Sequence, residues 1–345
     1  MDIQEHIPLA PLTTLQVGGS ARFFVRAATT HDVEESLDFA TSRDLPVFVL
    51  GGGSNVLISD NGWPGLVLQI GILGIAEEQA ARFSVGAGED WDRFVAQVVE
   101  KNYAGVECLS GIPGSVGGTP VQNVGAYGQE VSETIVSVLA FHRQGNRVRD
   151  LSPADCGFSY RASIFNTSQR GRYIILRVTY ALRAGGAPNL RYGDLQKYFA
   201  GRDRTPSLSE VRDAVLKIRA SKGMVISRGD PDSRSAGSFF KNPVLSASQF
   251  DDLERRAKAR NLQVPSYPAL AHQHKVSAAW LVEQSEFPKG YVKGNTGISN
   301  KHALALINRG GASAAEIVGL QQEIQTRVES AWGIRLETEP VFVGF

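Results

Sequence analysis

Two glycine-rich segments are the residues of this sequence most suited to binding a ligand. Gly51-Gly52-Gly53-Ser54-Asn55 directly follows the apolar run Pro46 to Leu50, which is typical of a buried strand. Glycines let the backbone approach a ligand closely, and successive N–H groups can form a nest for an anion. Ser54 and Asn55 add side-chain donors. The segment matches neither a GxGxxG fingerprint nor a P-loop, which needs a lysine, so a simple tight turn remains an alternative.

The second segment runs from Ser110 to Pro120 with the sequence SGIPGSVGGTP, and further small or polar residues follow it as far as Gly128. Connections this long without secondary structure are uncommon unless they are functional. A pyrophosphate or an isoalloxazine ring could be held by such exposed backbone N–H groups. A glycine-rich structural connection is the alternative.

In their order, these segments and three later motifs resemble the UDP-N-acetylenolpyruvoylglucosamine reductase family, in its longer type with a tyrosine loop that closes over the substrate. The resemblance extends from Leu12 to Val343, and the motif around Ser238 is more specific to the reductase than the glycine loops are. The motifs are Gly51 to Leu57, Ile112 to Gly118, Gln122 to Gly128, Gly157 to Ser163, Gly237 to Pro243 and Leu336 to Pro340.

This resemblance implies a reaction in peptidoglycan precursor synthesis. NADPH would reduce FAD, the reduced flavin would pass a hydride to C3 of the enolpyruvyl group, and a proton would be added at C2 to give UDP-N-acetylmuramate. The implied catalytic residues are Arg161, Ser238 and Glu339. The wider implied context is that of a flavoprotein oxidoreductase in cell wall biogenesis, cell shape and cell division.

The chemistry of these three side chains fits those roles. A serine hydroxyl is a very weak acid, but it can protonate a strongly basic carbanion or enolate, so Ser238 could be the donor. Arg161 offers a planar cation for the substrate carboxylate, and Glu339 could share a proton with that carboxylate or orient Arg161. Each has a structural alternative: Ser238 could cap a turn, Arg161 could lie at the surface, and Glu339 could be a strand-edge charge. Glu337 and Glu339 would share one face of a strand, so only the resemblance selects Glu339.

The resemblance also implies binding residues. For FAD they are Gly51, Gly52, Gly53, Ser54, Asn55, Ile112, Pro113, Gly114, Ser115, Gly117, Gly118, Gln122, Asn123, Gly125, Ala126 and Tyr127. For the UDP-sugar they are Tyr160, Tyr192, Lys222, Asn242, Lys289 and His302. Tyr192 could instead pack under a loop, and His302 stands where some relatives have glutamine. Residues 223–236 form a longer and more polar segment than in many relatives.

Periodicity predicts the elements that position these residues. Helices are expected from His31 to Arg43 and after Asp90, where five apolar residues from Trp91 to Val99 share one face. Capping boxes at Ser207, Ser246 and Ser313 predict three later helices, the last ending at Gly333. Strands are expected at 46–50, 66–70, 83–85, 135–141, 173–182 and 334–342.

We therefore expect an α+β protein whose FAD-binding region, of the PCMH or vanillyl-alcohol-oxidase-like type, has two parts. Residues 1–75 and 76–225 would hold FAD between them, and 226–337 would form an α+β substrate domain. The last strand, 338–345, would return to the first part and carry Glu339 with it.

Composition narrows the class of protein. A net charge of +1 gives no broad electrostatic footprint for nucleic acid. The sequence has no 18-residue apolar run and no signal-peptide pattern, and its two cysteines form no CxxC pair, so we expect a cytoplasmic protein without metal or membrane insertion. We also expect a monomer. A FAD oxidase or dehydrogenase of the same fold is the alternative enzyme, although neither glycine loop contains a histidine for covalent attachment; a non-enzymatic nucleotide-binding protein is a further alternative.

Overall fold

The computed structural model describes residues 1–227, 229–268 and 272–345. The chain divides into two units. The first comprises Met1–Ile7, Ala21–Gly53 and Trp63–Ser221, and the second comprises Pro8–Ser20, Ser54–Gly62 and Lys222–Phe345. The division of the sequence into three parts remains a prediction.

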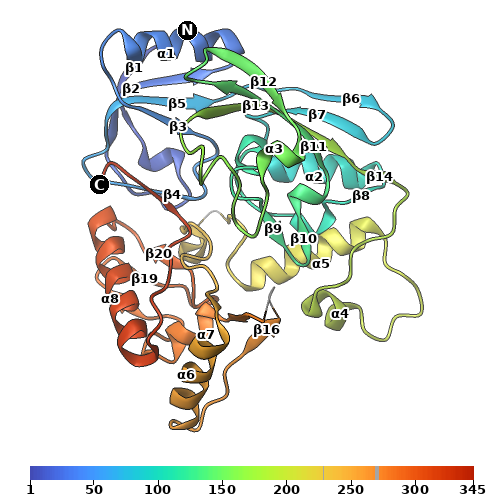
Figure 1. The fold of residues 1–345 in the computed structure, drawn as a ribbon, viewed down its shortest axis with the longest axis vertical. Coiled ribbons are helices and arrows are strands. Elements are labelled where there is room, and N and C mark those ends of the chain that lie inside the picture. The colour runs from blue at the N-terminus through green and yellow to red at the C-terminus, as the bar shows by residue number, and fades with distance from the viewer. Residues whose placement is uncertain (228, 269–271) are drawn as a thin grey trace. The chain divides into compact units, whose positions relative to one another are not determined.

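The first unit contains two main sheets (Figure 1). The smaller sheet has the order β1-β2-β5-β3, with β5 parallel to both its neighbours. The larger sheet has the order β12-β11-β13-β7-β6 and is antiparallel. The strands are β1 Gln4–Pro8, β2 Ser20–Ala27, β3 Val47–Leu50, β5 Trp63–Ile70, β6 Ile75–Gln79, β7 Arg82–Gly86, β11 Ile135–His142, β12 Arg147–Leu151 and β13 Tyr173–Ala181.

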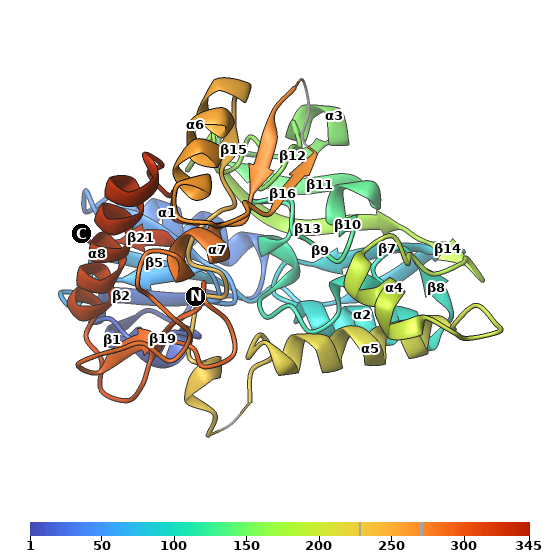
Figure 2. The same cartoon turned by 90° about the horizontal axis from the view of Figure 1, so that it is seen from below.

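Short strands and helices complete this unit. Two small antiparallel pairs join β8 with β14 and β9 with β10. Figure 2 shows α2 and α5 side by side, and the two helices are in contact. The bounds are α1 Thr30–Thr41, α2 Trp91–Glu100, α3 Pro153–Cys156, α4 Gly193–Phe199, α5 Leu208–Ser221, β8 Tyr103–Ala104, β9 Gly125–Ala126, β10 Gln129–Glu130, β14 Arg183–Ala184, and the 3₁₀ turns Glu107–Leu109, Val116–Gly118 and Val131–Glu133.

The helix after Asp90 forms as its sequence predicts. The Asp90 side chain accepts a hydrogen bond from Arg93 N at 2.8 Å and so caps α2. All five predicted apolar residues of its inner face are buried. Trp91 and Phe94 pack against Tyr180 of β13, with ring centroids 5.8 and 5.2 Å away. Aromatic burial of this size fixes α2, and with it the segment that follows, on the larger sheet.

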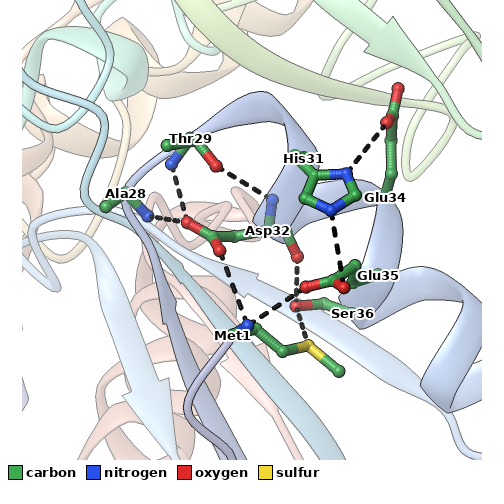
Figure 3. A network of polar contacts seen from close by, with 8 residues as sticks. All are labelled: Met1, Ala28, Thr29, His31, Asp32, Glu34, Glu35 and Ser36. Atoms are coloured by element: carbon green, nitrogen blue, oxygen red, sulfur yellow. Dashed lines mark hydrogen bonds and ion pairs between the residues drawn. The ribbon is translucent and has the colours of Figure 1, made fainter.

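The amino terminus is held on α1. The Met1 ammonium lies 3.0 Å from a Glu35 oxygen and 3.9 Å from an Asp32 oxygen, while Thr29 and Asp32 form a capping box (Figure 3). These groups are close to solvent, so the ion pairs contribute little to stability.

The second unit has a separate apolar core. Its sheets have the orders β15-β17-β16, β18-β19-β20 and β21-β4. Helix α8 packs on β19 and β20 (Figure 1). The core of the unit includes Phe239, Phe240, Leu320 and Trp332. The bounds are β4 Val56–Ile58, β15 Val244–Leu245, β16 Ser266–Pro268, β17 His274–Val276, β18 Val292–Lys293, β19 Thr296–Ile298, β20 Leu306–Asn308, β21 Val341–Val343, α6 Ala247–Lys258, α7 Ala278–Glu283, α8 Ala314–Trp332, and the 3₁₀ turns Ala10–Leu12 and Pro231–Ser233.

The three capping-box predictions are confirmed. The hydroxyl of each serine, Ser207, Ser246 and Ser313, accepts a hydrogen bond from the backbone N–H three residues later. The backbone N–H of each serine in turn donates to the Glu or Gln side chain at that position. Helix α8 ends at Gly333 with φ 71°, as predicted. The last strand was predicted too long: β21 begins at Val341, and before it only Thr338 forms a bridge, to Phe240. The Ile334 and Leu336 side chains instead turn into the core of the second unit.

None of the helices in the described part of the chain is long and apolar enough to cross a membrane.

Candidate functional site

The two glycine segments meet within the first unit. A Cβ placed on Gly52 would lie 2.6 Å from Gly114 Cα, and one on Gly51 would lie 2.9 Å from Ser115 Oγ. Gly53 has φ +67°, a conformation that side chains disfavour. The glycines here are therefore required by the close contact of two loops. Ser54 and Asn55, predicted with them, belong to the second unit, where Asn55 Nδ2 donates to Glu339 O at 3.3 Å.

Helices α2 and α5 hold the second glycine segment in place. Asp92 of α2 accepts a hydrogen bond from Gly111 N at 2.6 Å and two from the Arg212 guanidinium of α5, at 2.5 and 2.9 Å. Burial raises the pKa of Asp92, but these hydrogen bonds and the positive charge of Arg212 outweigh it and leave that pKa below its usual value. Trp91 N also donates to Gly114 O at 3.0 Å. The backbone of the loop is thus fixed before any ligand binds.

Residues of this loop fit a bound cofactor. The Ser115 hydroxyl is buried, and its oxygen has no hydrogen-bond partner among the described residues. Such a group costs free energy unless something bonds to it. A Cβ on Gly118 would meet nothing within 4 Å, whereas one on Gly117 would lie 2.7 Å from Ala87 Cβ. One side of the turn at Val116–Gly118 is therefore packed and the other open, as expected of a loop that holds FAD. Ile112 and Pro113 lie in the same loop.

The segment from Gln122 to Gly128 is held by Asn123. This side chain is 1% exposed; it donates to Glu130 Oε2 at 2.8 Å and to Ser159 O at 3.1 Å, and it accepts from Ser132 N at 3.1 Å. Gly125 and Ala126 form β9, and Tyr127 follows with φ 48°. Asn123 itself has φ 44°. Two non-glycine residues in the left-handed region within one loop mark a backbone that its surroundings impose.

Arg161 is bonded to this segment. It lies in the tight turn between Ser159 and Ala162, has φ 54°, and its Nη2 donates to Gly125 O at 2.9 Å. Its guanidinium carbon lies 5.4 Å from the ring centroid of Tyr160, which is 40% exposed. The structure therefore brings the predicted catalytic arginine to the predicted cofactor loop.

Tyr192 lies against Tyr127. Their ring centroids are 5.2 Å apart in an edge-to-face arrangement, and Tyr192 is 43% exposed. Its carbonyl accepts from Leu195 N and Gln196 N at 3.0 Å each, so the residue sits at the start of α4. Tyr192 thus packs on a neighbouring ring and still reaches solvent, and its role at the substrate stays a prediction.

The motif that contains Ser238 pairs through its backbone with the chain around Glu339 within the second unit. Glu339 N donates to Phe239 O at 2.9 Å, and Phe240 bridges to Thr338. Gly237 with φ +74° precedes Ser238, and the completely buried rings of Phe239 and Phe240 follow it. Glu337 is 78% exposed and pairs with Lys241 at 3.3 Å, whereas Glu339 is half-buried. The two glutamates that sequence spacing leaves equivalent therefore have different surroundings.

The predicted nucleotide contacts also lie in the second unit. His302 has a pKa lowered to about 4, first by burial and then by the charges of Lys222 and Lys289. Leu304 N donates to His302 Nδ1 at 3.0 Å, which leaves Nε2 as the protonated nitrogen of the neutral ring. Asn242 is hydrogen-bonded to a different element, since its Oδ1 accepts from Ala278 N at the start of α7.

The unusually polar segment 223–236 supports this group. Lys301 Nζ donates to Asp230 Oδ2 at 2.5 Å, and Asn300 N donates to Asp232 Oδ1 at 3.0 Å. The segment thus binds the turn that carries His302. Arg228, which belongs to it, lies outside the described residues.

The buried residues that fix the backbone around the second glycine segment were not predicted from the sequence. Asp92 and Arg212 are 120 positions apart, so no local pattern could pair them. Glu107 is completely buried next to the second glycine segment. A signal for Glu107 was present, because it is the one charged residue in the otherwise apolar or small run Tyr103 to Leu109.

Both parts of the chain match known protein families. Residues 21–150 match the family model of the FAD binding domain, and residues 230–343 match that of the UDP-N-acetylenolpyruvoylglucosamine reductase C-terminal domain. The chain is 46% identical to UDP-N-acetylenolpyruvoylglucosamine reductase of Thermobifida fusca, covering 98% of this chain and 97% of that one. It is 44% identical to the reductase of Streptomyces coelicolor, covering 98% and 89%.

Among solved structures, the crystal structure of UDP-N-acetylenolpyruvylglucosamine reductase from Thermus caldophilus matches with a TM-score of 0.70 at 23% identity, covering 99% of each chain. At that identity the match establishes the fold, which is the expected α+β architecture. The family models and the full-length relatives together show that this chain belongs to the UDP-N-acetylenolpyruvoylglucosamine reductase family, whose members are FAD-dependent oxidoreductases of peptidoglycan precursor synthesis.

Proposed function

We propose that this protein uses NADPH and FAD to reduce UDP-N-acetylglucosamine enolpyruvate to UDP-N-acetylmuramate, with Ser238 as proton donor and Arg161 and Glu339 at the substrate carboxylate. The single observation that carries the assignment of roles is the backbone pairing of the Ser238 motif with the chain around Glu339, with Glu339 N 2.9 Å from Phe239 O. That pairing supports a shared site for a weak acid and a carboxylate that are 101 positions apart in the sequence.

FAD, when bound, supplies the hydride that reaches C3 of the enolpyruvyl group. Delivery of a hydride there makes C2 strongly basic, and the weakly acidic Ser238 hydroxyl can then transfer its proton to C2. The backbone that carries Ser238 is turned by Gly237 and held by two buried phenylalanines. Glu339 orients the substrate carboxylate or shares a proton with it.

Arg161 would stabilise the charge that collects on the carboxylate and enolate oxygens. A guanidinium can bind two oxygens at once, and charge-assisted hydrogen bonds of this kind are about twice as strong as neutral ones. The bond from Arg161 Nη2 to Gly125 O supports its placement beside the cofactor loop.

The UDP group would be bound by lysines and neutral donors. Lys222 and Lys289 act on His302 as nearby positive charges, which supports a common site for a diphosphate. His302 would donate through Nε2 where some relatives use glutamine, and Tyr160, Tyr192 and Asn242 would complete the contacts. We place the reaction in the cytoplasm, with the protein acting as a monomer of three parts: 1–75 with 338–345, 76–225 and 226–337.

An anaerobic absorbance titration tests this proposal. The purified protein should be yellow, lose its visible absorbance with NADPH, and regain it when UDP-N-acetylglucosamine enolpyruvate is added. A flavin that NADPH reduces but that this UDP-sugar leaves reduced would overturn the substrate assignment. Rapid reoxidation by oxygen alone would instead favour an oxidase.

A further inference from the structure

Glu107 is a buried carboxylate that the proposed mechanism does not use. Its side chain is 0% exposed. Oε2 accepts from Gly105 N at 2.7 Å, and Oε1 accepts from Gln129 Nε2 at 2.9 Å and from Asn189 N at 2.8 Å. Gln129 Oε1 in turn accepts from Cys108 N at 2.8 Å. A carboxylate removed from water is costly unless hydrogen bonds satisfy it, so three donors from three chain segments amount to a specific arrangement.

These bonds fix the backbone of Asn189 from both sides. Its N–H donates to Glu107, and its carbonyl accepts from the Cys108 thiol at 3.2 Å. Burial first, and then the negative charge of Glu107, raise the pKa of Cys108, so that thiol stays protonated and remains a donor. Asn189 is thereby held by two consecutive residues just before the second glycine segment.

The side chain of Asn189 forms hydrogen bonds next to both Tyr127 and Tyr192. Its Nδ2 donates to Gly128 O at 2.8 Å, and its Oδ1 accepts from Arg191 N at 3.0 Å. Gly128 follows Tyr127 and Arg191 precedes Tyr192, and these are the two tyrosines whose rings pack edge to face. On the other side, Leu195 of α4 is completely buried beside Cys108. The loop carrying Tyr192 is thus attached to the chain around Glu107 before and after the tyrosine.

We propose that Glu107 is a positioning residue for Tyr192: it holds the tyrosine loop against the cofactor loop in the geometry that binds the UDP-sugar. The inference rests on the proposed function, in which Tyr192 contacts the substrate. Glu107 has no role in the chemical step, so its loss changes substrate binding and leaves proton and hydride transfer intact.

Glu107→Gln is the most direct variant. It keeps the shape of the side chain, but its NH₂ group must face either Gly105 N or the pair formed by Asn189 N and Gln129 Nε2. In either orientation the negative charge is lost, so a bond from Asn189 N that remains goes to a neutral acceptor and is weaker. Gln129 cannot turn its amide to compensate without losing the bond from Cys108 N. Asn189→Ala is the second variant; it keeps Glu107 and removes only the side-chain links to Gly128 and Arg191.

Glu316→Gln is the matched control. Glu316 also accepts backbone N–H bonds, from Ser313 at 2.8 Å and Asn295 at 3.2 Å, but it lies in the second unit and its bonds do not lead to Tyr192. The holoenzymes are compared by flavin absorbance spectrum, kcat, and KM for UDP-N-acetylglucosamine enolpyruvate, together with Tyr192→Ala and the double variant Glu107→Gln/Tyr192→Ala.

Glu107→Gln should raise KM for the UDP-sugar about tenfold, the size expected for loss of one hydrogen bond to a charged group, with kcat within about twofold. Asn189→Ala should raise KM about threefold, because the backbone bond to Glu107 remains. Glu316→Gln should change neither constant. In the Tyr192→Ala background, Glu107→Gln should have no further effect on KM, because residues that act through one contact are not additive.

The possible results distinguish failure of the proposed function, of the Tyr192 role and of the Glu107 role. If the wild-type protein does not turn over the UDP-sugar, the proposed function itself fails. If Tyr192→Ala leaves KM unchanged, the substrate role of Tyr192 fails and the proposal for Glu107 falls with it. If Tyr192→Ala raises KM but Glu107→Gln raises it by the same factor in both backgrounds, Glu107 does not act through Tyr192. Should Glu107→Gln fail to fold, an unchanged KM in Asn189→Ala with a normal flavin spectrum overturns the proposal.

Discussion

Ser238 is carried on a backbone with little freedom to move. Gly237 turns the chain in front of it with φ +74°, and the next two residues bury their rings in the core of the second unit. Phe239 N donates to Leu304 O at 2.8 Å, and the Phe239 carbonyl accepts a hydrogen bond from Glu339 N. A backbone held in this way fixes the position of the Ser238 Cβ atom, which suits the proposed role of Ser238 as proton donor.

Ser238→Ala should separate the two half-reactions. Reduction by NADPH should be unchanged, whereas reoxidation by the enolpyruvyl substrate should slow about a thousandfold, within the usual range for removal of a general acid. Anaerobic stopped-flow absorbance measures both steps. Ser246→Ala, which removes only the cap of α6, is the control and should leave both rates unchanged. Wild-type reoxidation in Ser238→Ala would exclude Ser238 as the donor.

His302 should make the stability of the protein depend on pH in a specific window. The folded protein has the pKa of His302 lowered from 6.5 to about 4, so between these values the unfolded chain binds a proton that the folded chain does not. Stability from this group is therefore complete above pH 6.5 and is lost as the pH falls towards 4. From pH 7.5 to 5 the loss from His302 alone should be about 2 kcal/mol.

Urea unfolding at the two pH values measures this loss. His302→Gln offers an oxygen acceptor for Leu304 N without a titrating ring, so its stability should fall by less than that of the wild type over the same range. An equal fall in the variant would show that the pKa of His302 is not lowered.

At the level of elements, the second glycine-rich loop, a proposed FAD-binding loop, is held by helices that local sequence patterns do not connect to it. Helix α2 presents Asp92 to Gly111, and α5 supplies Arg212 to the same carboxylate. The glycines of the first segment then pack onto this fixed loop. A loop without regular structure can be rigid when its backbone bonds lead to two packed helices.

Gly52→Ala tests this packing. The new Cβ would lie 2.6 Å from Gly114 Cα, so one loop must shift, and the protein should lose about 2 kcal/mol of unfolding free energy together with most of its bound FAD. Gly319→Ala is the matched control, because Gly319 lies inside α8 with nothing within 4 Å of a new Cβ. It should be stabilised by roughly 0.5–1 kcal/mol and keep its FAD. Thermal unfolding and the protein-bound flavin absorbance distinguish the two; full FAD content in Gly52→Ala would refute the contact.

At the level of the whole molecule, each of the two units has a core of its own. The first buries Trp91, Phe94 and Tyr180 between helix and sheet, and the second buries Phe239, Phe240 and Trp332. The proposed FAD loops at 112–118 and 122–127 lie in the first unit, and the proposed diphosphate group lies in the second.

Hydrogen exchange with each ligand alone should reveal this separation. FAD should slow exchange of the amides of 112–118 in the apoprotein, whereas UDP should slow exchange around Lys222, Lys289 and His302. Mass spectrometry of peptides from both regions measures this directly. Protection of 112–118 by UDP to the same extent as by FAD would contradict the assignment of the two sites to different units.

The sequence by itself determined the family, the five longest helices and several of the main strands. Capping boxes and 3.6-residue periodicity predicted α1, α2, α5, α6 and α8 because those signals act within a few residues of each other. Ordered motifs predicted the family, which full-length relatives confirm. The extent of the last strand was wrong, because Ile334 and Leu336 join a core that alternation alone does not reveal.

Only the tertiary structure decided which side chains meet. Glu337 and Glu339 are equivalent by spacing, and both pair through their backbone with the motif Gly237 to Pro243. In the fold, however, Glu337 is exposed and forms an ion pair with Lys241, whereas Glu339 is half-buried. Glu107, Asp92 and Arg212 acquired their partners from segments 19 to 120 positions away. Local sequence records the preference of a residue for helix, strand or turn, whereas a hydrogen bond between distant segments depends on where folding places both of them.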